Sequence, residues 1–123
     1  MTKRSASLLI GLWFLAVATS ASAECAWVLW DDNVFSSSRG GRNQSWEIRS
    51  AHQTKKECEE RRNVVWKERR DWLSATGYDI GHVPTPGSVG GTKSDTFGGT
   101  YLASNTYYCL PDTVDPRGPK AAQ

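Results

Sequence analysis

Most of the residue patterns that carry catalysis are missing from this sequence. It has two histidines, and it contains neither a Gly-x-Ser-x-Gly elbow nor a Gly-x-x-x-x-Gly-Lys-Ser/Thr phosphate loop. No Cys-x-x-Cys or His-x-x-x-His spacing is present, which argues against a zinc site. The adjacent Asp31 and Asp32 would point to opposite faces of an extended chain, so they cannot act as an acid–base pair. We therefore expect no catalytic residue, no cofactor and no bound metal.

A long hydrophobic run is also missing. The longest apolar run spans residues 8–18, whereas a membrane-spanning helix needs about 20 apolar residues. A basic pair at residues 3–4 precedes this run, and Ala-Ser-Ala at 21–23 follows it. This is the pattern of a secretory signal peptide that is cleaved between Ala23 and Glu24. We therefore predict that residues 1–23 are removed and that the protein is exported, to the periplasm or out of the cell.

Cleavage would leave 100 residues without an excess of charge of either sign. Two of the 15 Lys and Arg residues lie in the signal peptide, whereas all 13 Asp and Glu residues lie beyond it. A neutral domain lacks the net basic surface that binds nucleic acid, and it has no reason to bind an anionic membrane. The composition thus predicts neither a nucleic-acid partner nor a membrane partner, and it does not indicate which other partner binds.

Three cysteines remain after cleavage and would meet an oxidising compartment. An odd number allows one disulfide within the chain and leaves one thiol. Cys58 lies in the first turn of a predicted helix, and Cys109 lies near the end of the last predicted strand. A helix packed on the sheet would bring these two together, so Cys58–Cys109 is the favoured pair. Pairing of Cys25 with either of them stays an alternative; otherwise Cys25 is a free thiol or links two chains into a disulfide-bonded dimer.

The residues between the signal peptide and the first helix predict two strands. Residues 25–30 form the first, with apolar side chains on both faces. Asp31–Asn43 is polar and rich in serine and glycine, so we expect an exposed, mobile loop. Residues 45–50 alternate, with Trp46 and Ile48 on one face and Glu47 and Arg49 on the other, as in a half-buried strand antiparallel to the first.

A helix is predicted from Thr54 to about Ala75. Thr54 and Glu57 form a capping box, and Gly77 is a typical end. One stripe of this helix is apolar and faces the core: Cys58, Val65, Trp66, Trp72 and Leu73. Arg62 and Arg69 fall in the same arc. We interpret them as covering apolar surface with their stems while their charged heads reach solvent; the alternative is an anion-binding pair.

The remainder of the chain predicts further strands. Residues 77–92 contain prolines and glycines and should be irregular. Residues 93–97 and 100–103 flank Gly98-Gly99 as a hairpin, and a turn at Ser104-Asn105 leads to a last strand over 106–110. Residues 111–123 are expected to be an extended or disordered tail. The whole is thus a single α+β domain over residues 24–110, with one long helix packed on a small antiparallel sheet of four to five strands.

Two segments together resemble a known group of proteins. Residues 26–30 read Ala-Trp-Val-Leu-Trp, and residues 109–120 read Cys-Leu-Pro-Asp-Thr-Val-Asp-Pro-Arg-Gly-Pro-Lys. With Cys58 in the intervening helix, this sequence resembles a group of small bacterial secreted proteins of unknown function. The resemblance implies a bacterial exported protein, and it brings no activity, cofactor or catalytic residue with it.

These observations favour a small exported binding or structural module without catalysis. One alternative is a small periplasmic hydrolase or thiol-redox enzyme that uses Cys25 or His82. Another is a carbohydrate-binding protein that stacks sugars on an exposed tryptophan, although core packing is the favoured role of the five tryptophans beyond the signal peptide.

Overall fold

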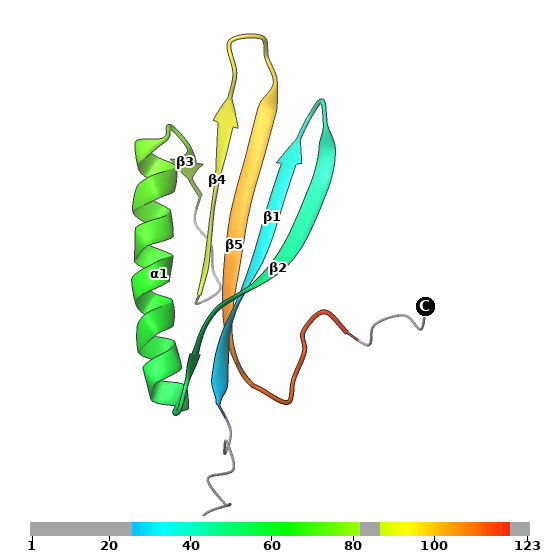
Figure 1. The fold of residues 1–123 in the computed structure, drawn as a ribbon. Coiled ribbons are helices and arrows are strands. Elements are labelled where there is room, and N and C mark those ends of the chain that lie inside the picture. Colours follow the sequence, from blue (N-terminus) through cyan, green and yellow to red (C-terminus); the bar gives the residue numbers. More distant parts are fainter. Residues whose placement is uncertain (1–25, 82–86, 119–123) are drawn as a thin grey trace, which may run out of the picture.

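The computed structural model describes residues 26–81 and 87–118 as one helix packed on one face of a five-stranded antiparallel sheet (Figure 1). The elements are β1 Trp27–Ser37, β2 Gly41–His52, α1 Lys55–Ala75, β3 Asp79–Ile80, β4 Ser88–Ser94 and β5 Thr100–Pro111. The strand order is β2-β1-β5-β4-β3, so the last strand lies between the first and the fourth. The predicted α+β arrangement is thus confirmed. The predicted cleavage site between Ala23 and Glu24, Cys25 and His82 lie outside the described residues.

The predicted loop over Asp31–Asn43 is wrong. Strand β1 continues to Ser37, a short turn follows, and β2 begins at Gly41, whose φ of 80° suits the tight reversal. The part of this hairpin near its turn lies away from α1 (Figure 1), and residues 41–45 of β2 are exposed. Polar side chains therefore incur no burial cost there, which is why a strand can carry a sequence typical of a loop.

The apolar side chains of β2 do not face the helix. Ile48 is 60% exposed, on the face of the sheet that turns away from α1. Glu47 pairs in register with Asp31 and points toward the helix. Arg49, two positions further along β2, lies on the helix side as well. A β-bulge opposite Leu29 and Trp30 inserts one extra residue into β2, so that Ser50 pairs with Leu29 and Ile48 with Trp30. The alternation of the strand was read correctly, but its polar face is the one that meets the helix.

The helix forms as its sequence predicts. Thr54 Oγ1 accepts a hydrogen bond from Glu57 N at 3.2 Å, and Glu57 Oε2 accepts one from Thr54 N at 3.4 Å, so the capping box is confirmed. Gly77, with a φ of 87°, follows the last turn. The buried core consists of side chains from the helix and from the inner face of the sheet: Leu29, Cys58, Val65, Leu73, Val89, Ala103 and Tyr107. Trp72 is half-exposed, so its predicted place in the core is wrong.

The last strand is longer than predicted. The expected turn at Ser104-Asn105 is wrong, because β5 runs without interruption from Thr100 to Pro111 and buries Asn105. The hairpin turn spans residues 95–99 rather than two glycines, since the Asp95 carboxylate accepts hydrogen bonds from the backbone N–H groups of Phe97 and Gly99. Residues 77–92 are also more regular than expected, because they include β3 and the start of β4.

Both ends of the described chain are fixed to the sheet. Cys58 and Cys109 form a disulfide between α1 and β5, with 5.9 Å between their Cα atoms, and this is the pair that the sequence favours. Residues 112–118 form turns: Asp112 N donates to Ala26 O at 2.8 Å, and the Arg117 guanidinium lies 5.2 Å from the centre of the Trp30 ring. Within residues 26–81 and 87–118, α1 lacks the apolar length that crossing a membrane would require.

Candidate functional site

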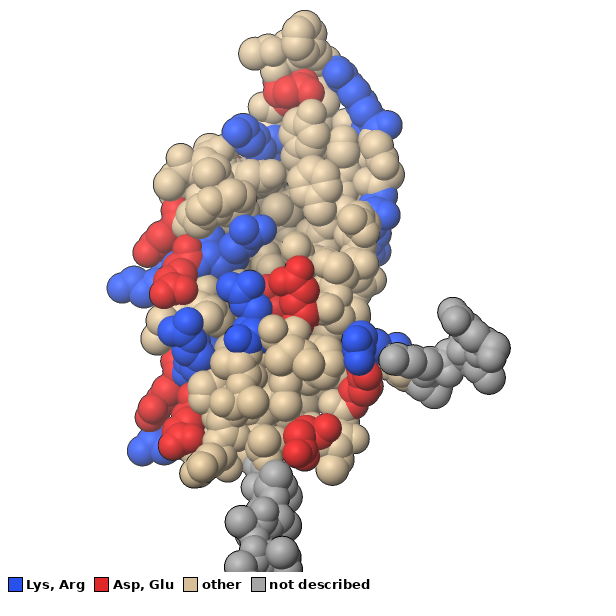
Figure 2. Space-filling model, in the orientation of Figure 1, with Lys and Arg blue, Asp and Glu red and all other residues tan. Residues whose placement is uncertain are grey.

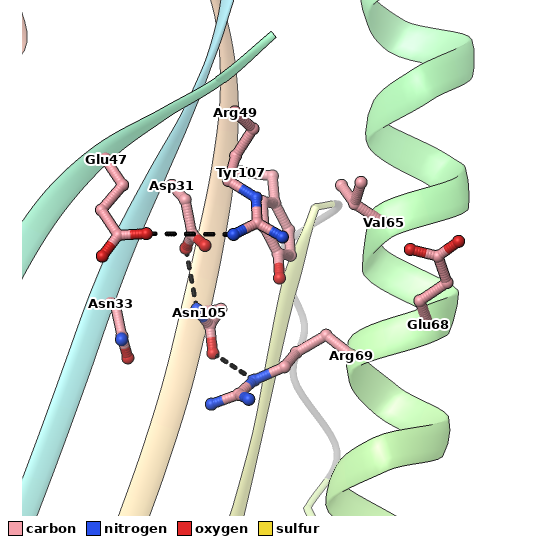
Figure 3. Close-up of a pocket in the computed structure, with 9 residues that line it drawn as sticks. All are labelled: Asp31, Asn33, Glu47, Arg49, Val65, Glu68, Arg69, Asn105 and Tyr107. Carbon is pink, nitrogen blue, oxygen red and sulfur yellow. Dashed lines mark hydrogen bonds and ion pairs between the residues drawn. The ribbon is translucent and has the colours of Figure 1, made fainter.

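A polar pocket of about 160 Å³ lies between α1 and the strands β1, β2 and β5 (Figure 3). Every side chain that lines it is polar or charged except Val65. The lining residues are Asp31, Asn33, Glu47, Arg49, Val65, Glu68, Arg69, Asn105 and Tyr107. The pocket forms because the inward face of β1 changes from Leu29 to the polar Asp31 and Asn33, and β2 adds Glu47 and Arg49 beside them, so the side chains no longer fill the space beneath the helix as a hydrophobic core would.

Three buried residues form the floor of this pocket. Asp31, Asn105 and Tyr107 are only 4%, 3% and 3% exposed. Asn105 Nδ2 donates a hydrogen bond to Asp31 Oδ1 at 2.8 Å, and Arg69 Nε donates one to Asn105 Oδ1 at 2.7 Å. The Asn105 amide therefore stands between a carboxylate and a guanidinium and orients both (Figure 3).

Charges of both signs surround this floor. Glu47 and Arg49 form an ion pair along β2 at 3.8 Å, and both side chains remain about half exposed. The guanidinium of Arg69 lies 4.3 Å from the centre of the Trp72 ring, which holds it from the other side. Figure 2 shows the same mixture on a larger scale, with basic and acidic side chains next to one another over the helix and at the centre of the visible face. No single sign of charge dominates the opening.

The floor keeps hydrogen-bonding capacity that the described residues do not use. Asp31 accepts through one carboxylate oxygen, and neither its Oδ2 nor the Tyr107 hydroxyl has a hydrogen-bond partner among residues 26–81 and 87–118. The two Nη groups of Arg69 are likewise without one in this part of the chain. Among the described residues the buried side-chain atoms without a partner are Trp30 Nε1 and Arg62 Nε, so the atoms of the floor are reached from the open space of the pocket instead. They are therefore accessible to a ligand that enters it.

Burial changes the acidity of two groups in the floor. Loss of solvent raises the pKa of Asp31 above its ordinary value of 3.8, and nearby Glu47 raises it further, while the Asn105 hydrogen bond and the charges of Arg49 and Arg69 oppose this. Burial and the neighbouring Asp31 raise the pKa of Tyr107 to about 12. Tyr107 is therefore a neutral hydroxyl at any physiological pH.

We predict that Asp31→Asn stabilises the protein at neutral pH. A folded-state pKa above the unfolded value means that the fold loses stability as pH rises from the unfolded pKa through the folded one. Asparagine keeps the oxygen that accepts from Asn105 and removes the buried charge. The midpoint of thermal unfolding should rise by a few degrees at pH 7, and the gain should shrink as the pH falls below about 4. A gain that is equal at pH 3 and pH 7 would show that the charge is not its cause.

Most of these residues were missed from the sequence. Asp31 fell in a predicted loop and Asn105 in a predicted turn, so neither was placed in a strand that faces the helix. The expectation that Arg69 extends its head into solvent is wrong, because it turns inward to Asn105. Arg62, expected to do the same, keeps its Nε buried without a partner among the described residues. The signal that could have found Asn105 is its place in the inward series Ala103, Asn105, Tyr107, Cys109, where it is the one polar amide.

The other candidate groups are not brought into this pocket. His52 ends β2, where its Nε2 lies 2.7 Å from Ser50 Oγ. Residues 26–81 and 87–118 contain no group of three or more His, Cys, Asp or Glu side chains placed to hold a metal ion. Comparison of the chain with models of protein families, with curated proteins and with solved structures finds no match in any of the three. The resemblance to small bacterial secreted proteins therefore stays a prediction, and the geometry of the pocket is the basis for assigning a function.

Proposed function

We propose that this protein is a small exported binding module without catalysis of its own, and that it holds a small polar ligand in the pocket beneath α1. The observation that carries the proposal is the set of unpartnered polar atoms in that pocket: Asp31 Oδ2, the Tyr107 hydroxyl and the Arg69 Nη groups. They come from three elements and border one cavity. A ligand that bonds to them would complete a network that the protein leaves open.

The same network is poorly suited to stabilising the fold. A buried carboxylate without a directly bonded cation carries a desolvation penalty, and apolar residues of similar volume often stabilise a core better than buried charges do. The disulfide and the buried apolar core already hold the helix on the sheet. The polar pocket beneath the helix is therefore better explained by ligand binding than by packing.

The chemistry of the pocket supports binding rather than covalent catalysis. Its lining residues include no serine, cysteine, histidine or lysine, so the pairs of nucleophile and base that these residue types form are absent from it. The alternative of a hydrolase or redox enzyme depends on Cys25 or His82, both outside the described residues. Export is supported by the signal-peptide pattern and by the Cys58–Cys109 disulfide, a bond that persists in oxidising compartments.

Carbohydrate binding through an exposed tryptophan has weaker support. Trp46 lies against Tyr108, with 5.7 Å between the ring centres, and Trp72 has the Arg69 guanidinium over its ring. Each ring therefore already has a neighbour where a sugar would stack. The one aromatic residue of the pocket, Tyr107, is almost fully buried, so its ring offers no stacking surface.

The proposal is tested by amide chemical shifts in ¹⁵N-labelled protein. Small amines, carboxylates, amino acids and polyols are added in turn, and at least one class should shift the amides near Asp31, Asn105 and Arg69 in a saturable way. Arg69→Gln should weaken that response, whereas Arg61→Gln, an exposed arginine on the same helix, should leave it unchanged. If no class shifts these amides, or if the shifts gather around Trp46 on the open face of the sheet, the pocket is not the binding site.

A further inference from the structure

Resting on the proposed function, we infer that the pocket binds a small zwitterion, an α-amino acid whose ammonium group is held by Asp31 and whose carboxylate is held by Arg69. Both protein groups are fixed by the same asparagine, and both keep polar atoms free toward the cavity.

The ammonium end follows from Asp31. Asp31 is only 4% exposed, and one of its carboxylate oxygens has no hydrogen-bond partner among the described residues. A buried carboxylate oxygen accepts hydrogen bonds and favours a positively charged donor, because the cation also offsets the cost of burying the charge. The neutral Tyr107 hydroxyl borders the same cavity and can accept a further N–H. An ammonium group, with three donors, matches these acceptors.

The carboxylate end follows from Arg69. Its Nε donates to Asn105, so the two Nη groups at the outer edge of the guanidinium stay available. Arg69 forms no ion pair with an acidic side chain among residues 26–81 and 87–118. A guanidinium fork binds a carboxylate through two parallel hydrogen bonds. Figure 3 shows Arg69 reaching from α1 toward the strands, whereas Glu68 stays beside the helix. The head of Arg69 is thus held in place by Asn105 and Trp72 and is open to an anion.

The spacing of the two ends follows from Asn105. Its amide offers a nitrogen to Asp31 and an oxygen to Arg69, and both atoms are attached to a single carbon. An α-amino acid presents the same order of donor and acceptor, with the ammonium and the carboxylate on adjoining carbons. An α-amino acid can therefore lie alongside the Asn105 amide. Its ammonium group then reaches Asp31 Oδ2, and its carboxylate reaches the Nη groups of Arg69.

Charge disfavours ligands with a single sign of charge, and size excludes large ligands. Asp31, Glu47 and Glu68 disfavour a lone anion, and Arg49 and Arg69 disfavour a lone cation, so a ligand with both charges meets the least repulsion. The cavity of about 160 Å³ is smaller than the roughly 300–1,000 Å³ of pockets for drug-sized ligands. A small amino acid such as glycine, alanine or serine fits this limit, and Val65 forms the apolar wall.

Isothermal titration with L-alanine and its two halves tests this inference. Ethylamine is alanine without the carboxylate, and propionate is alanine without the ammonium. L-Alanine should bind at least tenfold more tightly than either half. Asp31→Asn and Arg69→Gln should each weaken L-alanine by at least tenfold, whereas the controls Asp32→Asn, on the opposite face of β1, and Arg61→Gln should not.

The outcomes separate the inference from the proposal beneath it. If ethylamine, propionate or a neutral polyol such as glycerol shifts the pocket amides and binds as tightly as L-alanine, the zwitterion is wrong and the binding pocket stands. The inference also fails if L-alanine binds but Arg69→Gln leaves its affinity unchanged. If none of the four probes binds, both the inference and the proposed pocket are wrong.

Discussion

Removal of the Cys58–Cys109 disulfide is expected to lower the free energy of unfolding by about 4 kcal/mol. The bond closes a loop with a sequence separation of 51 residues, and in the chain-entropy model a loop of that length restricts the unfolded chain by about this amount. Small domains are typically stable by only about 5–15 kcal/mol, so the reduced protein should be marginal. The midpoint of thermal unfolding should fall by roughly 20 °C.

The measurement compares urea unfolding of the oxidised and reduced protein. A Cys25→Ser background leaves only the two cysteines of the disulfide, so no third thiol can exchange with it. The same background with Cys58→Ala and Cys109→Ala should match the reduced form within about 1–2 kcal/mol, because two small buried groups are lost in addition to the bond. If reduction leaves the unfolding midpoint unchanged, the disulfide does not stabilise this fold.

The features predicted correctly from the sequence are those specified by neighbouring residues. The capping box needs only Thr54 and Glu57, and the end of the helix needs only a glycine that tolerates positive φ. The disulfide could also be predicted, because the core-facing stripe of the helix and the inward face of the last strand each contain one cysteine. Once the α+β class was recognised, Cys58 and Cys109 had few other ways to be buried.

The pocket could not be predicted in this way because its residues are joined only by strand pairing. Asp31 and Asn105 are 74 positions apart, and they meet because β5 inserts beside β1 in antiparallel register. The β-bulge in the β1–β2 pairing also cannot be predicted from a local pattern, and it shifts the register so that Leu29 pairs with Ser50 and Trp30 with Ile48. A polar residue looks like part of a loop until the partner strand is known, which is why Asp31 was misplaced.

The assignment of faces in β1 and β2 predicts very different costs for two apolar truncations. Leu29→Ala should lower the free energy of unfolding by about 2–5 kcal/mol, because Leu29 is 0% exposed and its loss leaves a cavity between the sheet and α1. Ile48→Ala should change it by no more than about 0.5 kcal/mol, since Ile48 is 60% exposed on the open face. Urea unfolding of the two variants, each with the disulfide intact, gives both values.

The comparison decides between the two readings of β2. The alternating sequence alone favours Trp46 and Ile48 as the buried side, and in that case Ile48→Ala would cost as much as Leu29→Ala. The structure requires the reverse, because Glu47 and Arg49 then line the pocket with Asp31. An equal loss of stability in the two variants would mean that Ile48 faces the helix, and Glu47 and Arg49 would then not line the pocket. A large loss for Leu29→Ala alone would support the polar face of β2 as the wall of the binding site.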